Sequence, residues 1–258
     1  MKQGKTKQQL SLLKLTATWQ SIFLVICLSA LLGCGQTDNE QRIETKKKAK
    51  ISRQDTVIFD HEGGPIPDPH NLNPLVPSPT GPGMRQSCWE PLFILNYETG
   101  DIESWTGESF TSNESLDIWT LKIRAGVEWS DGEAFDADDV IFTINTLLND
   151  ATQSLGDAAS MQQWVDTVER IDPLTVRFNL KGPNPRFKLD YFSVRVGSSM
   201  VILPEHVWAD QDPATFKFYD PEKGWPIGTG AYRLVSASEN EFVFDRREDW
   251  WGAKSNFR

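Results

Sequence analysis

The chain has 258 residues, of which 36 are acidic and 26 are basic, so its formal net charge is −10. This length is ample for a buried core in one large domain or two small ones. An acidic chain repels nucleic acid, and the three cysteines lack the spacing of a metal knuckle, which excludes nucleic-acid-binding and zinc-knuckle classes.

Residues 1–33 have the pattern of an export signal. Lysines and no acidic residues precede Cys34, and the apolar run 22–32 is too short to span a bilayer as a mature helix. The run ends in Leu31-Leu32-Gly33-Cys34, which resembles a bacterial lipobox, and this resemblance implies that Cys34 is lipidated. Two or three acyl chains hold a protein on a membrane where one does not. A plain cleaved signal peptide or a membrane anchor is the alternative.

Residues 34–55 are expected to form the lipidated cysteine and a flexible tether. The stretch is polar and cannot bury enough apolar surface to order itself. For its Lys46-Lys47-Lys48 run, a solvated spacer and a contact with anionic headgroups both remain open. Cys88 is then the one cysteine of the body, and we expect a small buried side chain rather than a reactive surface thiol.

Val57-Ile58-Phe59 predicts a short apolar strand, and an extended loop follows it. Six prolines between Pro65 and Pro79 exclude helix and the interior of a strand. The same region contains possible metal ligands, namely Asp60, His61, Glu62, Asp68 and His70. Carboxylates and imidazoles bind transition metals. Here the acids are adjacent and prolines intervene, so nothing brings the side chains together and we predict no metal site.

The clearest local pattern runs from Trp119 to Leu148. Trp119, Leu121 and Ile123 alternate with polar residues, which predicts a half-buried strand. Ser130-Asp131-Gly132 then supplies the side-chain hydrogen bonds and the positive φ of a tight turn.

A capped helix is expected after this turn. Asp136 is a candidate N-cap, Asp138 and Asp139 fit the first turn, and apolar residues recur at helical spacing, namely Val140, Ile141, Ile144, Leu147 and Leu148. A second helix is expected over residues 155–168, with one apolar side made by Met161, Trp164, Val165 and Val168. Residues 174–180 alternate as a strand.

Near the C-terminal end, residues 228–234 lead into a strand. Residues 241–245 are expected to pair with it across Ser238-Glu239-Asn240 as a hairpin.

Two blocks of residues resemble one family. The first is LKIRAGVEWSDGEAFDADDVIFT at 121–143, and the second is PIGTGAYRL at 226–234 followed by RREDWWG at 246–252. Both are similar to signatures of the family 5 extracellular solute-binding proteins, the dipeptide, oligopeptide, nickel and oligosaccharide receptors of ABC importers. Ala231 stands where the family usually has Pro, and Trp250 where Tyr or Phe is common. The resemblance covers residues 57–258.

The resemblance implies a mixed α/β (α+β) fold, the first lobe of a two-lobed, periplasmic-binding-protein-like type II receptor. Residues 56–258 would form this N-terminal lobe, in which 56–90 and 204–258 make the core sheet and 91–203 an inserted subdomain. The family's second lobe is missing from the sequence. We therefore expect a fragment of a longer receptor or a truncated gene.

The resemblance also implies where a ligand binds. In this family the loop after the first strand faces the cleft, which places Glu62, Gly63 and Gly64 at the ligand, and glycines permit close backbone approach. Residues 86–96 resemble the family's passage from helix to strand, and Trp89 there is either a ligand-facing platform or a core residue. His206 is expected to be structural. No catalytic residue, cofactor or metal is predicted.

The implied function is that of a substrate-binding lipoprotein of an ABC importer, anchored by lipid and facing the periplasm or the cell exterior. It would capture peptides or oligosaccharides for a permease and its ATPase. Both ligand classes stay open, because tryptophan stacks on sugar rings but also fills cores.

Three other functions are considered. One is a membrane-anchored sensor or adhesion module that reuses the receptor lobe, and another is a truncated receptor without function. The third is a hydrolase that uses Asp131, Asp138 and Asp139. It is disfavoured because these acids suit a turn and a helix start, and because no nucleophile with a base is evident.

Overall fold

The computed structural model describes residues 52–58, 64–78, 83–194 and 199–254. The chain divides into two compact units, Met1–Phe59 and Asp60–Arg258. The described part of the first unit contains the 3-10 helix η1 (Arg53–Asp55), whose N-cap Ser52 accepts a hydrogen bond from the N–H of Gln54. The expected signal peptide and most of the expected tether lie outside the described residues.

The prediction of a strand at Val57-Ile58-Phe59 is wrong for Val57 and Ile58, the two residues of it that the structure describes. Val57 and Ile58 lie outside any strand and are 75% and 67% exposed. A strand is held by ladder hydrogen bonds to a neighbouring strand, and none of the described strands pairs with these two residues. Phe59 itself lies outside the described residues.

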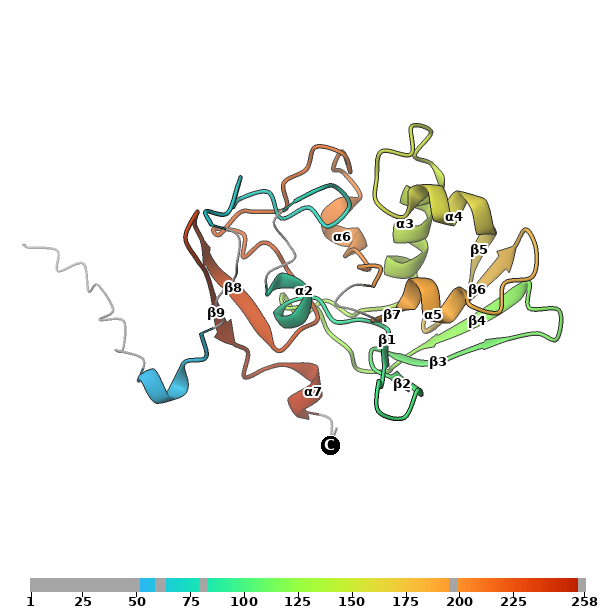
Figure 1. Cartoon of the computed structure of the whole chain (residues 1–258), viewed down its shortest axis with the longest axis horizontal. Helices are drawn as coiled ribbons and strands as arrows, with labels where there is room; N and C mark the ends of the chain where they lie inside the picture. Colours follow the sequence, from blue (N-terminus) through green and yellow to red (C-terminus); the bar gives the residue numbers. More distant parts are fainter. Residues whose placement is uncertain (1–51, 59–63, 79–82, 195–198, 255–258) are drawn as a thin grey trace, which may run out of the picture. The chain divides into compact units, whose positions relative to one another are not determined.

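The second unit contains a four-stranded antiparallel sheet with the order β3-β4-β6-β5 (Figure 1). Its strands are β3 (Gly107–Ser112), β4 (Ile118–Ile123), β5 (Val165–Asp172) and β6 (Thr175–Leu180). As predicted, Trp119, Leu121 and Ile123 share one buried face of β4, whereas Lys122 is exposed on the other face. The predicted strand over 174–180 is confirmed as β6.

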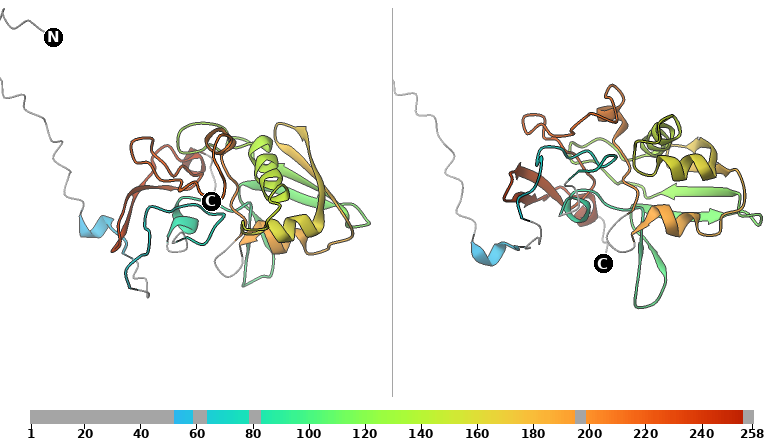
Figure 2. Two further views of the ribbon diagram at one scale, coloured as in Figure 1. Left: turned by 90° about the horizontal axis from the view of Figure 1, so that it is seen from above. Right: turned by 45° about the horizontal axis from the view of Figure 1, so that its top comes forward.

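Helices cover the buried face of this sheet. Helix α3 (Ala137–Leu148) packs on β5 and β6, and α5 (Phe187–Phe192) also lies beside the sheet (Figures 1 and 2). The aromatic rings of α5 pack on Phe110 of β3. The ring centroids of Phe187 and Phe192 lie 6.0 and 5.2 Å from that of Phe110. Over the described ranges, the helices are all too short or too polar to cross a bilayer.

The predicted helix cap is confirmed at α3. The side chain of Asp136 accepts a hydrogen bond from the N–H of Asp138 at 2.8 Å, and the Asp139 carboxylate accepts one from the N–H of Asp136 at 3.1 Å. These two bonds form a reciprocal capping box. The helix therefore begins where its sequence predicts.

The helix predicted over 155–168 is wrong in its last part. Helix α4 (Ala158–Trp164) ends at Trp164, and β5 begins at Val165. Val165 and Val168 are three residues apart and fit a helical face in the sequence. However, β5 pairs with β6, where Val168 lies opposite Phe178. This non-local pairing overrides the local spacing, since β-branched residues pack well on a sheet.

A smaller sheet follows the order β2-β1-β7, with β1 (Phe93–Leu95), β2 (Ile102–Ser104) and β7 (Ser193–Val194). The short helix α2 (Met84–Ser87) precedes β1, so the expected passage from helix to strand over 86–96 is confirmed. The described loop 64–78 contains neither helix nor strand, as its prolines predict.

The remaining elements follow residue 204. Helix α6 (Glu205–Trp208) precedes the predicted hairpin, which is confirmed as β8 (Tyr232–Ala237) and β9 (Phe242–Arg246), and α7 (Trp251–Lys254) follows it. β8 and β9 pair only with each other among the described strands, and 56–90 contributes no described strand. The described residues of 56–90 and 204–258 share no strand pairing. The seven strands β1 to β7 all fall within 91–203, and the division into domains stays a prediction.

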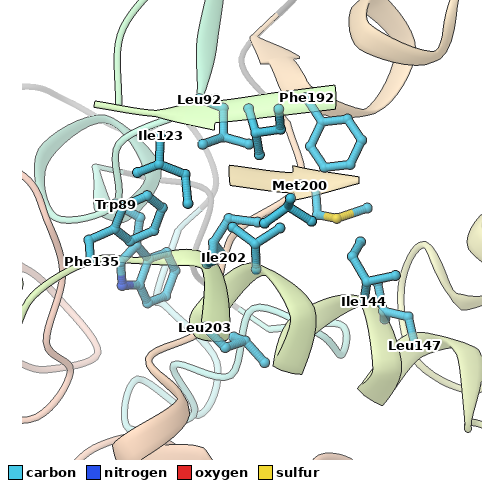
Figure 3. Packing of buried hydrophobic residues seen from close by; sticks show 14 of the residues in the cluster. Trp89, Leu92, Ile123, Phe135, Ile144, Leu147, Phe192, Met200, Ile202 and Leu203 are labelled. Atoms are coloured by element: carbon cyan, nitrogen blue, oxygen red, sulfur yellow. The ribbon is translucent and has the colours of Figure 1, made fainter. Parts of the chain in front are cut away.

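The buried side chains form one hydrophobic cluster that joins these elements. Figure 3 shows part of it between α3 and the strands, with labels on Trp89, Leu92, Ile123, Phe135, Ile144, Leu147, Phe192, Met200, Ile202 and Leu203. Cys88 belongs to the cluster and is 1% exposed, which confirms the buried side chain expected from the sequence. Burial raises the pKa of its thiol to about 12, so the thiol stays protonated and unreactive.

Candidate functional site

The loop expected to face the ligand is described only in part. Glu62 and Gly63 lie outside the described residues, as does Cys34. Gly64 has a φ of +73°, and no heavy atom lies within 4 Å of the position that a Cβ would take. The backbone at Gly64 is thus open to close approach, and a side chain at this φ would be strained.

Trp89 lies in the core. Its side chain is 5% exposed, its indole N–H donates to the carbonyl of Ile227 at 3.1 Å, and its ring stacks on Phe218 at a centroid distance of 6.3 Å. Trp89 also lines a cavity of about 60 Å³, together with Arg85, Glu90, Pro91, Val194, Ser199, Met200 and Val201. A cavity of this size has room for a few water molecules. A contact between Trp89 and a ligand stays a prediction.

The Pro226–Leu234 block packs directly on the segment that carries Trp89. A Cβ at Gly228 would overlap the carbonyl oxygen of Cys88, and a Cβ at Gly230 would overlap that of Ser87. The N–H of Gly230 donates to the Cys88 carbonyl at 2.8 Å. Glycine is therefore required at both positions by close backbone packing.

Glu90 is the polar centre of this junction. The indole N–H of Trp251 donates to its Oε2 at 2.7 Å, and the neutral side chains of Trp105, Trp250 and Thr229 also lower its pKa as polar neighbours. Burial raises the pKa of Glu90 to about 7, although these donors favour the charged form. Because all four partners are neutral, the charge of the carboxylate has no ionic partner among them.

Arg247 joins the two blocks that resemble the family. Its Nη1 donates to the carbonyls of Gly228 and Gly230 at 3.1 and 3.0 Å, and its Nη2 donates to the carbonyl of Trp129 at 3.3 Å. The residue is 6% exposed. A planar guanidinium can reach several carbonyls at once, so this one side chain fixes the second block against the first.

The carboxylates considered for a hydrolase each have a structural partner. Asp131 lies 2.8 Å from the Nε2 of His206, and Asp138 lies 3.1 Å from Arg170.

Asp139 is 4% exposed, and its carboxylate accepts hydrogen bonds from the Trp129 indole at 3.0 Å and from the N–H of Glu205 at 2.9 Å. Burial raises its pKa to about 6. These acids hold a turn, a helix start and α6 in place. The expected structural role of His206 agrees with its bond to Asp131.

The possible metal ligands also have other contacts where they are described. Asp68 pairs with Lys217 at 3.2 Å, and His70 stacks on Tyr219 at 4.4 Å. No group of three metal-binding side chains occurs within the described ranges. The three other candidates, Asp60, His61 and Glu62, lie outside them.

Sequence reasoning missed Glu90 and Arg247. Their partners are far away in the sequence, and no local periodicity marks either residue. The available signal was the second block itself, where Arg247 precedes Trp250 and Trp251 by three and four residues. A charged residue so close to two tryptophans indicates a buried polar group that needs hydrogen-bond partners.

The sequence profile of the bacterial extracellular solute-binding proteins, family 5, matches residues 101–258. The chain belongs to this family. The glutathione-binding protein GsiB of Escherichia coli is 27% identical over 194 residues, which are 75% of this chain and 34% of that protein. The nickel-binding periplasmic protein of Escherichia coli is 29% identical over 187 residues, 71% of this chain and 33% of that protein.

Solved structures give the same result. NikA from Brucella suis in complex with Fe(III)-EDTA has a TM-score of 0.57 at 28% identity, over 70% of this chain and 34% of that one. A mannohexaose-bound periplasmic oligopeptide-binding protein from Thermotoga maritima has a TM-score of 0.54 at 25% identity, over 66% and 29%. The predicted mixed α/β, type II fold is confirmed for part of such a receptor. The chain spans about a third of the length of the curated relatives that it matches.

Proposed function

We propose that this chain acts within the receptor of an ABC importer, where it helps to capture a small-molecule solute for a permease and its ATPase. The observation that carries the proposal is the contact between the two blocks typical of the family, where Arg247 of the second block donates to the Trp129 carbonyl of the first at 3.3 Å. The chain thus keeps the scaffold of family 5 receptors, and the matched relatives are named as binding proteins for glutathione and nickel.

Peptides or oligosaccharides are the proposed ligands. Support comes from the matched Thermotoga maritima protein, which is named as oligopeptide-binding and was crystallised with mannohexaose. The loop with Glu62, Gly63 and Gly64 would offer backbone groups to the ligand, and Trp89 would back that wall from the core. An open glycine backbone suits the hydrogen bonding of either ligand class.

Isothermal titration with glutathione, tripeptides and manno-oligosaccharides tests this proposal. Gly64→Ala is expected to raise the Kd of the ligand that binds by at least about fivefold, because it adds a methyl group and backbone strain where the ligand approaches. Gly100→Ala is the matched control, since Gly100 also has a positive φ (+80°) and no heavy atom within 4 Å of the place where a Cβ would lie. No heat from any of these compounds, or equal weakening in both variants, would contradict the proposal.

We also propose that Cys34 is lipidated and holds the protein on the membrane. The apolar run before Leu31-Leu32-Gly33-Cys34 supports this. Cys34→Ser is expected to move the protein from the membrane fraction to the soluble fraction. Membrane association that survives the substitution would refute lipidation as the anchor.

A further inference from the structure

The cavity of about 60 Å³ that Trp89 lines also contains a charged side chain, Arg85 of α2, and we name it the Arg85 cavity. Apart from Trp89 and Met200, its lining residues are half-buried rather than buried, so the cavity opens to the surface. Most of its wall is apolar, and its polar lining residues are Arg85, Glu90 and Ser199. An apolar wall with a few polar groups is typical of a site for a small molecule.

The guanidinium of Arg85 has no anionic partner at bonding distance among the described residues. Its Nη1 donates to the carbonyl of Ser199 at 2.9 Å, and its Nη2 donates to that of Pro74 at 3.4 Å. Asp157 favours its charged form, but within the described ranges no carboxylate forms a salt bridge with it. Burial lowers the pKa of Arg85, because part of its hydration is lost. Since a guanidinium has more N–H groups than these carbonyls accept, Arg85 can still bind an anion.

Ser199 supplies a second donor on the same wall. Its Oγ lies 3.5 Å from the Met200 carbonyl, at the outer limit of a hydrogen bond, so the hydroxyl is weakly held there. The cavity therefore presents a cation and a hydroxyl, both of which can donate to an acceptor. A carboxylate suits these donors because it is the planar, charged partner that a guanidinium bonds most strongly. Its few atoms also fit a cavity with room for about four water molecules.

Glu90 is the one acid among the described lining residues, and it leaves room for an anion at Arg85. Its Oε2 is already bonded to the Trp251 indole. Burial raises the pKa of Glu90 to about 7, so at pH 6 most of this carboxyl is neutral and repels an anion little. The cavity is then positively charged.

Arg85 also connects the cavity to the loop that the family resemblance places at the ligand. Pro74, whose carbonyl accepts from Nη2, belongs to the described loop 64–78, which starts at the open backbone of Gly64. A solute held against this loop would have the cavity beside it. Only one end group of such a solute would enter, because the cavity is too small for more.

We propose that the Arg85 cavity binds a carboxylate of a short peptide, with Arg85 and Ser199 as the donors that select it. The inference rests on the proposed function and narrows its solute class to peptides. A neutral oligosaccharide has no anion to offer this guanidinium, so it would leave the charge uncompensated. The carboxylate comes from the C-terminus of the peptide or from an acidic side chain.

Isothermal titration at pH 6 compares three probes, namely trialanine, trialanine amide and the amide of Ala-Asp-Ala. Trialanine amide is expected to bind at least about tenfold more weakly than trialanine, because a charge-assisted pair with Arg85 is lost. Affinity restored in the Ala-Asp-Ala amide would assign the site to a side-chain carboxylate, and affinity that stays low would assign it to the C-terminus. Equal binding of trialanine and its amide would overturn the proposal.

The ratio of the two trialanine Kd values separates recognition from a structural role. In Arg85→Gln the ratio is expected to fall to within about twofold of one, because the amide never used the guanidinium. Arg233→Gln makes the same change at an exposed position of β8 and is expected to keep the ratio. If Arg85 only supported the fold, its loss would weaken both peptides alike and leave the ratio unchanged, which would overturn the inference.

Ser199→Leu tests the cavity without touching Arg85. It replaces a half-buried hydroxyl by an apolar side chain that fills the cavity, while the backbone carbonyl that accepts from Arg85 remains. The ratio is expected to fall here as well, and thermal unfolding checks that each variant folds. An unchanged ratio would place the carboxylate elsewhere. Binding of manno-oligosaccharides but of no peptide would overturn this inference and leave the receptor function standing, whereas no binding of any probe would contradict both.

Discussion

Glu90 shows how one buried group can organise a junction. Its carboxylate accepts a hydrogen bond from the Trp251 indole at 2.7 Å, and the indoles of Trp250 and Trp251 both donate to the Thr229 carbonyl at 3.0 Å. An apolar residue at this position would remove the carboxylate acceptor of the Trp251 indole, which would keep only the Thr229 carbonyl.

The raised pKa of Glu90 predicts how stability depends on pH. Its folded-state pKa is about 7 against an ordinary value of 4.5, so the folded state holds more protons between these pH values. The free energy of unfolding therefore falls as pH rises from 4.5 to 7, by at most about 1.4 kcal/mol per pH unit from this group. Burial raises the pKa of Asp139 from 3.8 to about 6. Its titration therefore also lowers the free energy of unfolding as pH rises, but over the lower range between these two values.

Urea denaturation of Glu90→Gln and the unchanged protein between pH 6 and pH 7 isolates the Glu90 contribution. The variant is expected to be less stable at every pH, because an amide offers only one acceptor, but its stability should change less with pH. Stability curves that run parallel over this range would show that Glu90 does not titrate there.

Gly228 allows a second prediction at a single residue. A methyl group there would overlap the backbone carbonyl of Cys88, which cannot move without shifting the core. Gly228→Ala is expected to destabilise the protein by about 3 kcal/mol or more through overpacking. Gly182→Ala is the control, because nothing lies within 4 Å of a Cβ there and φ is not positive. Similar melting temperatures for both variants would refute the packing argument.

Helix α3 depends on its cap, because its first turn carries Asp136, Asp138 and Asp139 in distinct roles. Asp136→Ala removes the acceptor for the N–H of Asp138 and is expected to cost about 1 kcal/mol in the free energy of unfolding. Asp210→Ala removes the same charge from an exposed position and should change stability by less than about 0.5 kcal/mol. Chemical denaturation measures both, and equal losses would contradict a capping role.

The elements that the sequence predicts correctly are those with local causes. Strand β4 follows from the alternation of Trp119, Leu121 and Ile123, and α3 follows from its cap and helical spacing. The start of β5 was missed because Val165 and Val168 satisfy a helical spacing, and only the pairing with β6 decides between helix and strand. The strand at Val57 failed because apolar character alone does not supply a partner strand.

The candidate site was less predictable than the elements, for a related reason. The resemblance indicated which blocks matter but not how they meet. Glu90 and Trp251 are 161 residues apart in the sequence, and Trp129 and Arg247 are 118 apart. Contacts over such separations leave no local period, so Trp89 and its surroundings could be placed only once the structure showed the core.

At the scale of the whole molecule, the second unit should unfold as one body, because its buried side chains form a single cluster and Arg247 bonds the two family blocks together. Arg247→Lys keeps the charge but loses the forked geometry, so carbonyls of Gly228, Gly230 or Trp129 are left without a donor. We expect a loss of about 3 kcal/mol.

The neighbouring Arg246 is exposed, so Arg246→Lys is the matched control and should change stability by less than about 0.5 kcal/mol. Thermal unfolding followed by tryptophan fluorescence and by far-ultraviolet circular dichroism should give coincident transitions for the unchanged protein. In Arg247→Lys both transitions should shift downward, and the fluorescence transition should come first, since Trp250 and Trp251 lie next to the altered residue. Transitions that stay where they are would show that the two blocks hold together without Arg247.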